Sequence, residues 1–238
     1  MNQEVLDLLA NADKVLVGIG ESFERKDSCF LTESFKQFEK ENSLLAGWER
    51  LQYWKKHPDQ KAIDAYNRLF EIIKEKDYFV VTTCMDDRIY DSMIPEEKIA
   101  APCGTWRFLQ CSVQCTDELL PVTSQMVDKG EIILCPHCGK VVSFNQVNCE
   151  KYNESGYMAQ WAAYRNWLQR TINQKLCILE LGVGMRYPTI IRWPFEKIAY
   201  CNNKASFVRV HEMLYQLTPE LSDKGNSIEA NPIDFLLA

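Results

Sequence analysis

The sequence has few glycines and prolines, no long apolar run and no excess of positive charge. Its 238 residues include only 10 Gly and 9 Pro, while hydrophobic residues make up 46%. This composition excludes fibrous, low-complexity and disordered proteins, and describes a chain that folds around a core. A chain of this length can form one large domain or two small ones, so an isolated metal-binding knuckle is excluded as well.

Two further absences argue against membranes and nucleic acids as partners. No stretch approaches the roughly 18 to 20 apolar residues that a membrane span needs, and the first residues lack the charged-then-apolar layout of a signal peptide. The formal net charge is −6, so a sequence-independent grip on phosphate backbones is not expected. We therefore expect a cytoplasmic protein that binds neither membrane nor nucleic acid.

Apolar periodicity predicts an α/β protein. Continuous apolar runs at 14–20, 78–83 and 176–181 are typical of buried strands, and the stretches between them have helical spacing. Strands separated by helices indicate a parallel sheet. The other predicted elements are helices at 5–9, 32–56 (with a break near Gly47), 60–76 and 158–171, short strands at 197–201 and 207–210, and a surface tail from Leu221.

Residues 104–144 interrupt this alternation with short strands and four clustered cysteines. Cys111 and Cys115 form one pair, and Cys135 and Cys138 form a second pair after 19 intervening residues, with Gly139 allowing a tight turn. Two such pairs can bring four thiolates around Zn²⁺ in a closed, structural site. The alternative is that the four are reduced, buried thiols, which leaves their pairing unexplained.

Two more cysteines stand where an α/β fold places its binding crevice. Cys84 follows a predicted parallel strand, and Cys103 immediately precedes the insertion. One interpretation is therefore a thiol enzyme or redox sensor, with zinc serving only the scaffold.

Two glycine pairs follow predicted strands and indicate a nucleotide site. Gly18 and Gly20 follow the first strand, and Gly182 and Gly184 follow a later one, so both turns can face one crevice at the carboxyl ends of parallel strands. Glu21 would repel a phosphate there unless it faces away or bonds a ribose. Each pair could also serve only as a tight turn.

Taken together, these motifs resemble the sirtuin family from about Val15 to His211. The family's Gly-Ala-Gly-Ile-Ser is similar to residues 18–22, its Thr-Gln-Asn-Ile-Asp to 82–86, its His-Gly to 103–104, its Phe-Gly-Glu to 144–146, its Gly-Thr-Ser to 182–184 and its Val-Ile-Ile-Asn to 208–211. The zinc module lies at the family's position. Cys84 replaces the family's Asn, Cys103 replaces the His that acts as general base, and the Pro-Asp-Phe-Arg element is absent.

The resemblance implies a Rossmann-like parallel sheet flanked by helices over 1–103 and 145–238, with a zinc-binding module inserted at 104–144. It implies NAD as cofactor and structural zinc on Cys111, Cys115, Cys135 and Cys138. It places Cys103 and Cys84 at the catalytic positions, and assigns cofactor binding to Gly18, Gly20, Glu21, Ser22, Thr82, Asp86, Gly182, Val183, Gly184 and His211.

The loss of His and Asn argues against lysine deacylation, because general-base help is worth roughly 10² to 10⁴ in rate. We therefore expect an enzyme that uses NAD as an ADP-ribosyl donor, to modify a protein or to hydrolyse NAD. The alternative is a non-catalytic relative that binds ADP-ribose, another nucleotide or a protein partner.

Overall fold

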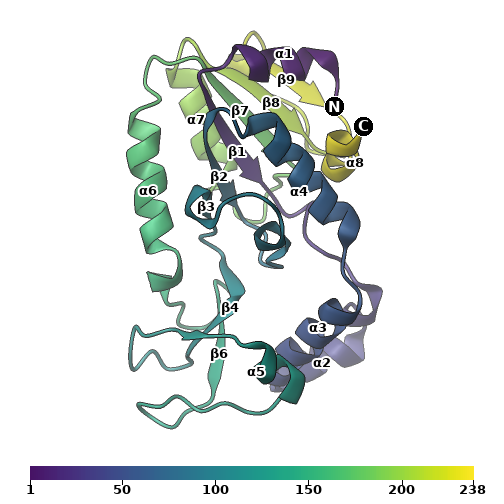
Figure 1. Cartoon of the computed structure of the whole chain (residues 1–238), viewed down its shortest axis with the longest axis vertical. Helices are drawn as coiled ribbons and strands as arrows, with labels where there is room; N and C mark the ends of the chain where they lie inside the picture. The colour runs from purple at the N-terminus through teal and green to yellow at the C-terminus, as the bar shows by residue number, and fades with distance from the viewer.

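Six parallel strands form the main sheet of the structure, a computed structural model that describes residues 1–238 (Figure 1). Across the sheet the strands run β3 (Ile99–Ala100), β2 (Asp77–Thr82), β1 (Lys14–Ile19), β7 (Leu176–Leu181), β8 (Ser206–Val210) and β9 (Gly225–Ile228). The central strands β1, β2 and β7 are buried on both faces, which is why they are almost continuously apolar. The predicted α/β class is confirmed.

Helices cover the two faces of the sheet and divide the core in two. In β1, Val15 and Val17 face a cluster that includes residues of α1 (Gln3–Asn11), α4 (Gln60–Ile73) and α8 (Pro232–Leu237). Leu16 faces the opposite cluster, which includes residues of α6 (Met158–Gln169) and α7 (Arg192–Cys201). This alternation of side chains fixes which face each helix covers.

The order of strands creates a crevice of known type. The chain runs outward from β1 through β2 to β3, and then returns beside β1 to build β7, β8 and β9. The direction of winding therefore reverses between β1 and β7, a position we call the switch point. In doubly wound sheets, ligands bind beyond the carboxyl ends of the strands at this place.

A smaller module lies at the other end of the molecule (Figure 1). Its antiparallel sheet has the order β5 (Leu120–Pro121), β4 (Gly104–Cys111), β6 (Val142–Gln146), with α5 (Ser124–Lys129) between β5 and β6. Two earlier helices, α2 (Glu33–Glu41) and α3 (Ser43–Lys56), join this module. Leu44 and Trp48 of α3 share a third core with Leu109 and Phe144. The helices at 33–56 therefore pack with the inserted module, although they precede it in the sequence. The domain boundaries at 104 and 144 stay a proposal.

The break in the 32–56 helical stretch lies at Asn42, not near Gly47 as predicted. Thr32 caps α2 by accepting a hydrogen bond from the Phe35 N–H, and Asn42 separates α2 from α3. Gly47 lies within α3, where a Cβ atom would come within 2.1 Å of the Phe144 ring. This glycine serves close packing rather than a helix end.

Two predictions at the C-terminal end are wrong. Residues 197–201 belong to α7, which buries Phe195 and Ala199 one turn apart. The segment after Leu221 forms β9 and α8, and α8 buries Phe235 and Leu236 in the main core. A short apolar segment such as 197–201 fits a strand or an amphipathic helix equally well by periodicity. β9 and α8 contain only a few apolar residues among polar ones, so their pattern gave no clear prediction of an element.

None of the helices combines the length and apolar character that crossing a bilayer requires.

Candidate functional site

The two glycine turns meet at the switch point. The Gly20 N–H donates to Leu181 O at 2.9 Å, and the Ser22 N–H donates to Gly182 O at 3.1 Å. A Cβ on Gly20 would lie 2.3 Å from the Val183 Cα, so only glycine allows the turns to approach this closely. The residues after β1 and β7 therefore form one joined structure.

His211, at the end of β8, completes the polar edge of these turns. Its Nδ1 accepts the N–H groups of Met213 and Leu214, each at 3.0 Å, so the ring proton lies on Nε2. That N–H donates to Ser22 Oγ at 3.2 Å. Burial lowers the pKa of His211, which keeps the ring neutral at pH 7.

Glu21 faces the second glycine turn. Its carboxylate accepts the N–H groups of Gly184 and Arg186, each at 3.1 Å. This negative charge is held by backbone donors and ties the loop after β7 to the loop after β1.

Three backbone donors remain without a protein acceptor at these turns: the N–H groups of Glu21, Val183 and Met185. Phe23 is fully buried, with its ring 5.1 Å from that of Tyr66, and Met185 is 53% exposed. Neither side chain therefore plugs the crevice, and unpaired amides at the end of a parallel sheet suit an anionic ligand.

Three of the predicted nucleotide-binding residues make contacts within the fold, and their role in binding stays a prediction. Gly18 lies inside β1 beneath α7, where a Cβ would contact Ile191 at 2.5 Å. Thr82 is fully buried and its hydroxyl accepts the Cys84 N–H. Asp86 is ion-paired with the Arg88 guanidinium at 2.7 Å. Asp86 also accepts a hydrogen bond from the Arg25 N–H at 2.7 Å, which ties the loop after β2 to the loop after β1.

Cys103 and Cys84 lack the surroundings of a reactive thiol. Cys103 is fully buried, and burial raises its pKa to about 12. Burial also raises the pKa of Cys84 well above its usual value, and its thiol contacts Gly20 O at 3.0 Å. A thiolate needs a partly exposed, cationic environment, so the condition for nucleophilic chemistry is not met.

Comparison with solved structures decides the fold. A Sir2 enzyme studied for its mechanism and regulation matches 98% of this chain and 93% of its own, with 18% identity and a TM-score of 0.62. A Sir2 protein solved with a p53 peptide and NAD⁺ matches 100% and 96%, with 15% identity and a TM-score of 0.59. The chain has the sirtuin fold. No protein-family model matches it.

Two curated relatives carry names of ADP-ribosyl chemistry. One, from Fusarium oxysporum f. sp. cubense, is a probable bifunctional ADP-ribose hydrolase/ADP-ribosyltransferase, 29% identical over 171 residues, which are 64% of this chain and 29% of that protein. The other is a protein ADP-ribosyltransferase of Staphylococcus aureus (strain Mu50 / ATCC 700699), 20% identical over 90% of this chain and 78% of its own. The chain thus spans under a third of the first relative and most of the second.

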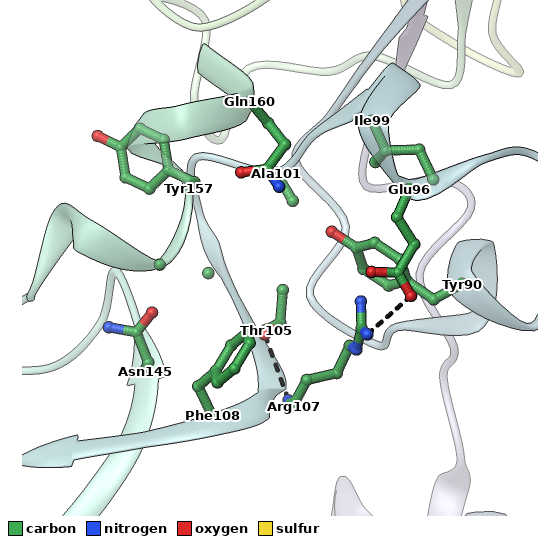
Figure 2. Close-up of a pocket in the computed structure, with 12 residues that line it drawn as sticks. Tyr90, Glu96, Ile99, Ala101, Thr105, Arg107, Phe108, Asn145, Tyr157 and Gln160 are labelled. Atoms are coloured by element: carbon green, nitrogen blue, oxygen red, sulfur yellow. Dashed lines mark hydrogen bonds and ion pairs between the residues drawn. The ribbon is translucent and has the colours of Figure 1, made fainter. Parts of the chain in front are cut away.

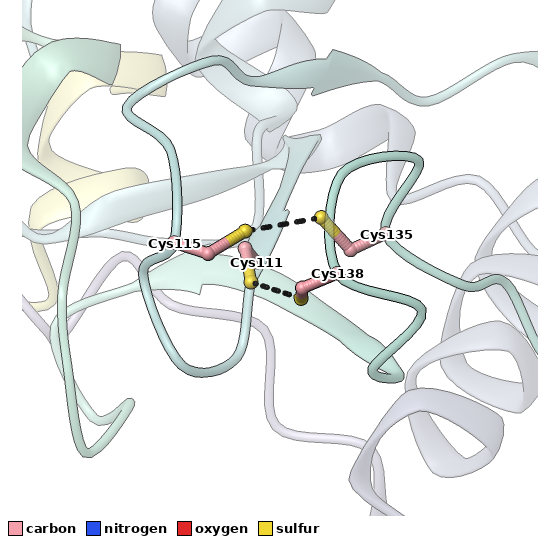
Figure 3. Close-up of side chains that lie close together, drawn as sticks. All are labelled: Cys111, Cys115, Cys135 and Cys138. Carbon is pink, nitrogen blue, oxygen red and sulfur yellow. Dashed lines mark hydrogen bonds between the residues drawn. The ribbon is translucent and has the colours of Figure 1, made fainter.

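The four clustered cysteines of this sirtuin-like chain converge as predicted (Figure 3). Their sulfur atoms all lie within 4.8 Å of one another, with 3.5 Å between those of Cys111 and Cys138 and 3.6 Å between those of Cys115 and Cys135. All four are free of disulfides. A tetrahedral Zn–S site with bonds of about 2.3 Å requires sulfurs about 3.8 Å apart, so this donor set fits zinc.

A cavity of about 100 Å³ lies where the two parts of the sirtuin-like chain meet (Figure 2). Arg107 of β4 pairs with Glu96 at 2.8 Å on one side, and Tyr157 and Gln160 approach from the start of α6. The glycine turns do not line it. No motif in the sequence predicts this cavity, because its lining residues come from several separate segments of the chain.

Sequence reasoning also missed Glu24 and, as a structural partner, Arg186. These side chains form an ion pair of 2.6 Å between the loops after β1 and β7. Glu24 stands in the segment where the family's Pro-Asp-Phe-Arg pattern fails, so the motif comparison gave it no weight.

Proposed function

We propose that this chain binds NAD at the switch point and transfers its ADP-ribosyl group to a protein acceptor. The observation that carries the proposal is the joined pair of glycine turns, with three unpaired amides and a neutral His211 beside Ser22. The sirtuin fold and the two relatives named for ADP-ribosyl transfer support the same function.

The residues at the turns divide the task of holding a dinucleotide. The N–H groups of Glu21, Val183 and Met185 suit the diphosphate, because unpaired donors stabilise negative charge. The Ser22 hydroxyl and the His211 ring suit a ribose hydroxyl. NAD serves as a substrate that supplies an activated ribose carbon, and the protein's part is to orient it and exclude water.

Transfer is favoured over lysine deacylation because the general base is missing. A buried thiol with a pKa of about 12 is protonated at neutral pH and cannot accept a proton from a ribose hydroxyl. A reaction in which nicotinamide departs before the acceptor bonds makes less demand on that position. The assignment of Cys103 and Cys84 as catalytic stays a prediction, and their burial favours a space-filling role.

We propose zinc as the metal of the four-cysteine cluster, in a structural role, since four thiolates leave no position for a reactant. None of the ten cysteines forms a disulfide, which suits a reducing compartment and supports the cytoplasm as the proposed location.

A non-catalytic nucleotide-binding module is the second candidate. Glu21 favours it, because its carboxylate already occupies two amides of the second turn and would compete with a phosphate. This candidate predicts binding of ADP-ribose without consumption of NAD.

Incubation with NAD and a cell extract separates the two candidates. Mass spectrometry should find released nicotinamide together with proteins heavier by one ADP-ribosyl group, both in proportion to enzyme. A preparation that binds ADP-ribose but releases no nicotinamide would favour the non-catalytic module. Free ADP-ribose without modified protein would indicate NAD hydrolysis.

A further inference from the structure

Glu24 is a largely buried carboxylate at the edge of the candidate nucleotide site. One oxygen, Oε2, pairs with the Arg186 guanidinium at 2.6 Å, while the other, Oε1, is buried without a hydrogen-bond partner. Burial raises the pKa of Glu24 above its ordinary value, although the Arg186 cation and the nearby Met85 backbone N–H act to lower it. The Met85 N–H does not make a well-aligned hydrogen bond to the carboxylate. Buried polar atoms are almost always paired, so an orphan oxygen beside a substrate site calls for a functional explanation.

The groups around Glu24 come from three other segments at this end of the sheet. Arg186 follows β7, and Asp86 follows β2; their charges change the pKa of Glu24. Cys84 also follows β2, and Cys103 precedes β4; burial and the charge of Glu24 raise the pKa of both thiols. Glu24 makes the largest electrostatic contribution to the raised pKa of Cys103. The negative charge of Glu24 therefore acts, after burial, at both cysteine positions, neither of which can accept a proton.

We propose that Glu24 is the proton acceptor of the ADP-ribosyl transfer step, with Arg186 as the positioning residue that fixes its carboxylate. The inference rests on the proposed function. In this step the C1′–nitrogen bond of NAD breaks with its electron pair going to nicotinamide, and an acceptor hydroxyl or water bonds C1′. The proton of that acceptor moves to Oε1 of Glu24 and later to solvent.

The two oxygens of Glu24 have different surroundings. Oε2 is held by a cation, which fixes the side chain, and Oε1 is left for the incoming hydrogen. At neutral pH roughly one Cys103 thiol in 10⁵ is ionised for a pKa of about 12, so the thiol is no competitor for the proton. A general base is most effective when its pKa lies close to the working pH, and burial moves Glu24 in that direction.

Glu24→Gln in the full chain tests this assignment, with Glu97→Gln as an exposed control. The amide keeps the size of the side chain and an oxygen for Arg186, but cannot take the proton. We expect kcat for ADP-ribosyl transfer to the acceptor to fall about 10²-fold or more, as for loss of a general base, while the Kd for ADP-ribose changes less than threefold. Glu97→Gln should retain the wild-type rate.

The pH profile separates proton transfer from a structural role. The wild-type kcat should rise with pH through one ionisation, and Glu24→Gln should be flat over the same range. Arg186→Gln removes the cation that favours the charged carboxylate, so it should move this rise to higher pH. If Glu24→Gln fails to fold, Glu24→Ala with added formate should recover part of the lost rate.

The outcomes distinguish this inference from the function on which it rests. A wild-type protein that never releases nicotinamide would overturn both. Wild-type release combined with an unchanged rate and pH profile in Glu24→Gln would overturn only the role of Glu24. Equal losses of ADP-ribose binding and of rate would also overturn it, because the residue would then act in binding.

Discussion

At the scale of single residues, close approach explains Gly20 better than contact with a ligand does. Because Gly20 has no Cβ, the turn after β1 lies against the backbone of Gly182 and Val183. A Cβ added to Gly20 would lie 2.4 Å from Gly182 O and 2.3 Å from Val183 Cα. Backbone cannot move aside as a flexible side chain can. The glycine therefore holds the fold at the switch point together.

Gly20→Ala should consequently destabilise the whole protein by about 1–3 kcal/mol, the usual cost of overpacking. Thermal unfolding followed by circular dichroism measures this directly. A glycine needed only for the approach of a ligand would give the opposite result, namely intact stability with lost nucleotide binding. An unchanged melting temperature would show that the turns separate freely and that the contact carries no stability.

Cys103 should react slowly with alkylating agents. Because it is buried with a pKa of about 12, roughly one molecule in 10⁴ carries the thiolate at pH 8. The exposed Cys29 and Cys201 serve as controls within the same chain. Timed iodoacetamide labelling with peptide mass analysis should show both modified well before Cys103. If Cys103 were labelled first, its thiol would be reactive, and the interpretation of the protein as a thiol enzyme would be favoured.

The glycine turns, Ser22 and His211 could be predicted to meet from the sequence, because they belong to short motifs with fixed spacing. It could not show that Gly18 and Thr82 would be buried, because the direction in which a strand residue points depends on its neighbours in the sheet. Nor could it show that Asp86, in the loop after β2, would pair with Arg88. Glu24 escaped notice for a different reason. Its role depends on Arg186, which lies 162 residues further along the chain.

At the scale of elements, the cysteine cluster and α3 depend on one another. Cys111 and Cys135 belong to the same core as Leu44 and Trp48, and the Trp48 indole N–H donates to Glu131 O at 3.0 Å. The cysteine cluster therefore joins two segments that are distant in sequence. Spacing predicted that the four cysteines would converge, but gave no indication that α2 and α3 would pack beside them.

Cys135→Ser should thus loosen α3 as well as the inserted module. Metal analysis should find about one zinc in the wild-type chain and substantially less in the variant, with a shift in Trp48 fluorescence as its pocket opens. Cys201→Ser, at an exposed position on α7, is the matched control. A variant that lost zinc yet kept wild-type fluorescence would contradict the coupling.

At the scale of the whole molecule, the sheet order determines where the site lies. Apolar runs revealed most of the strands, but not that β1 and β7 would be neighbours or that β9 would extend the sheet. That order comes from long-range packing, in which the alternate faces of β1 bury against different helices. It brings the loops after β1, β7 and β8 to one edge.

Calorimetric titration of the protein with ADP-ribose tests the central claim, that this edge binds a nucleotide. The wild-type chain should bind one equivalent, and His211→Gln should weaken binding at least tenfold by disturbing the bond to Ser22. His57→Gln, which alters an exposed histidine at the end of α3, should change the affinity less than twofold. Absence of binding by the wild-type protein at millimolar ADP-ribose, or equal affinity of both variants, would contradict the account.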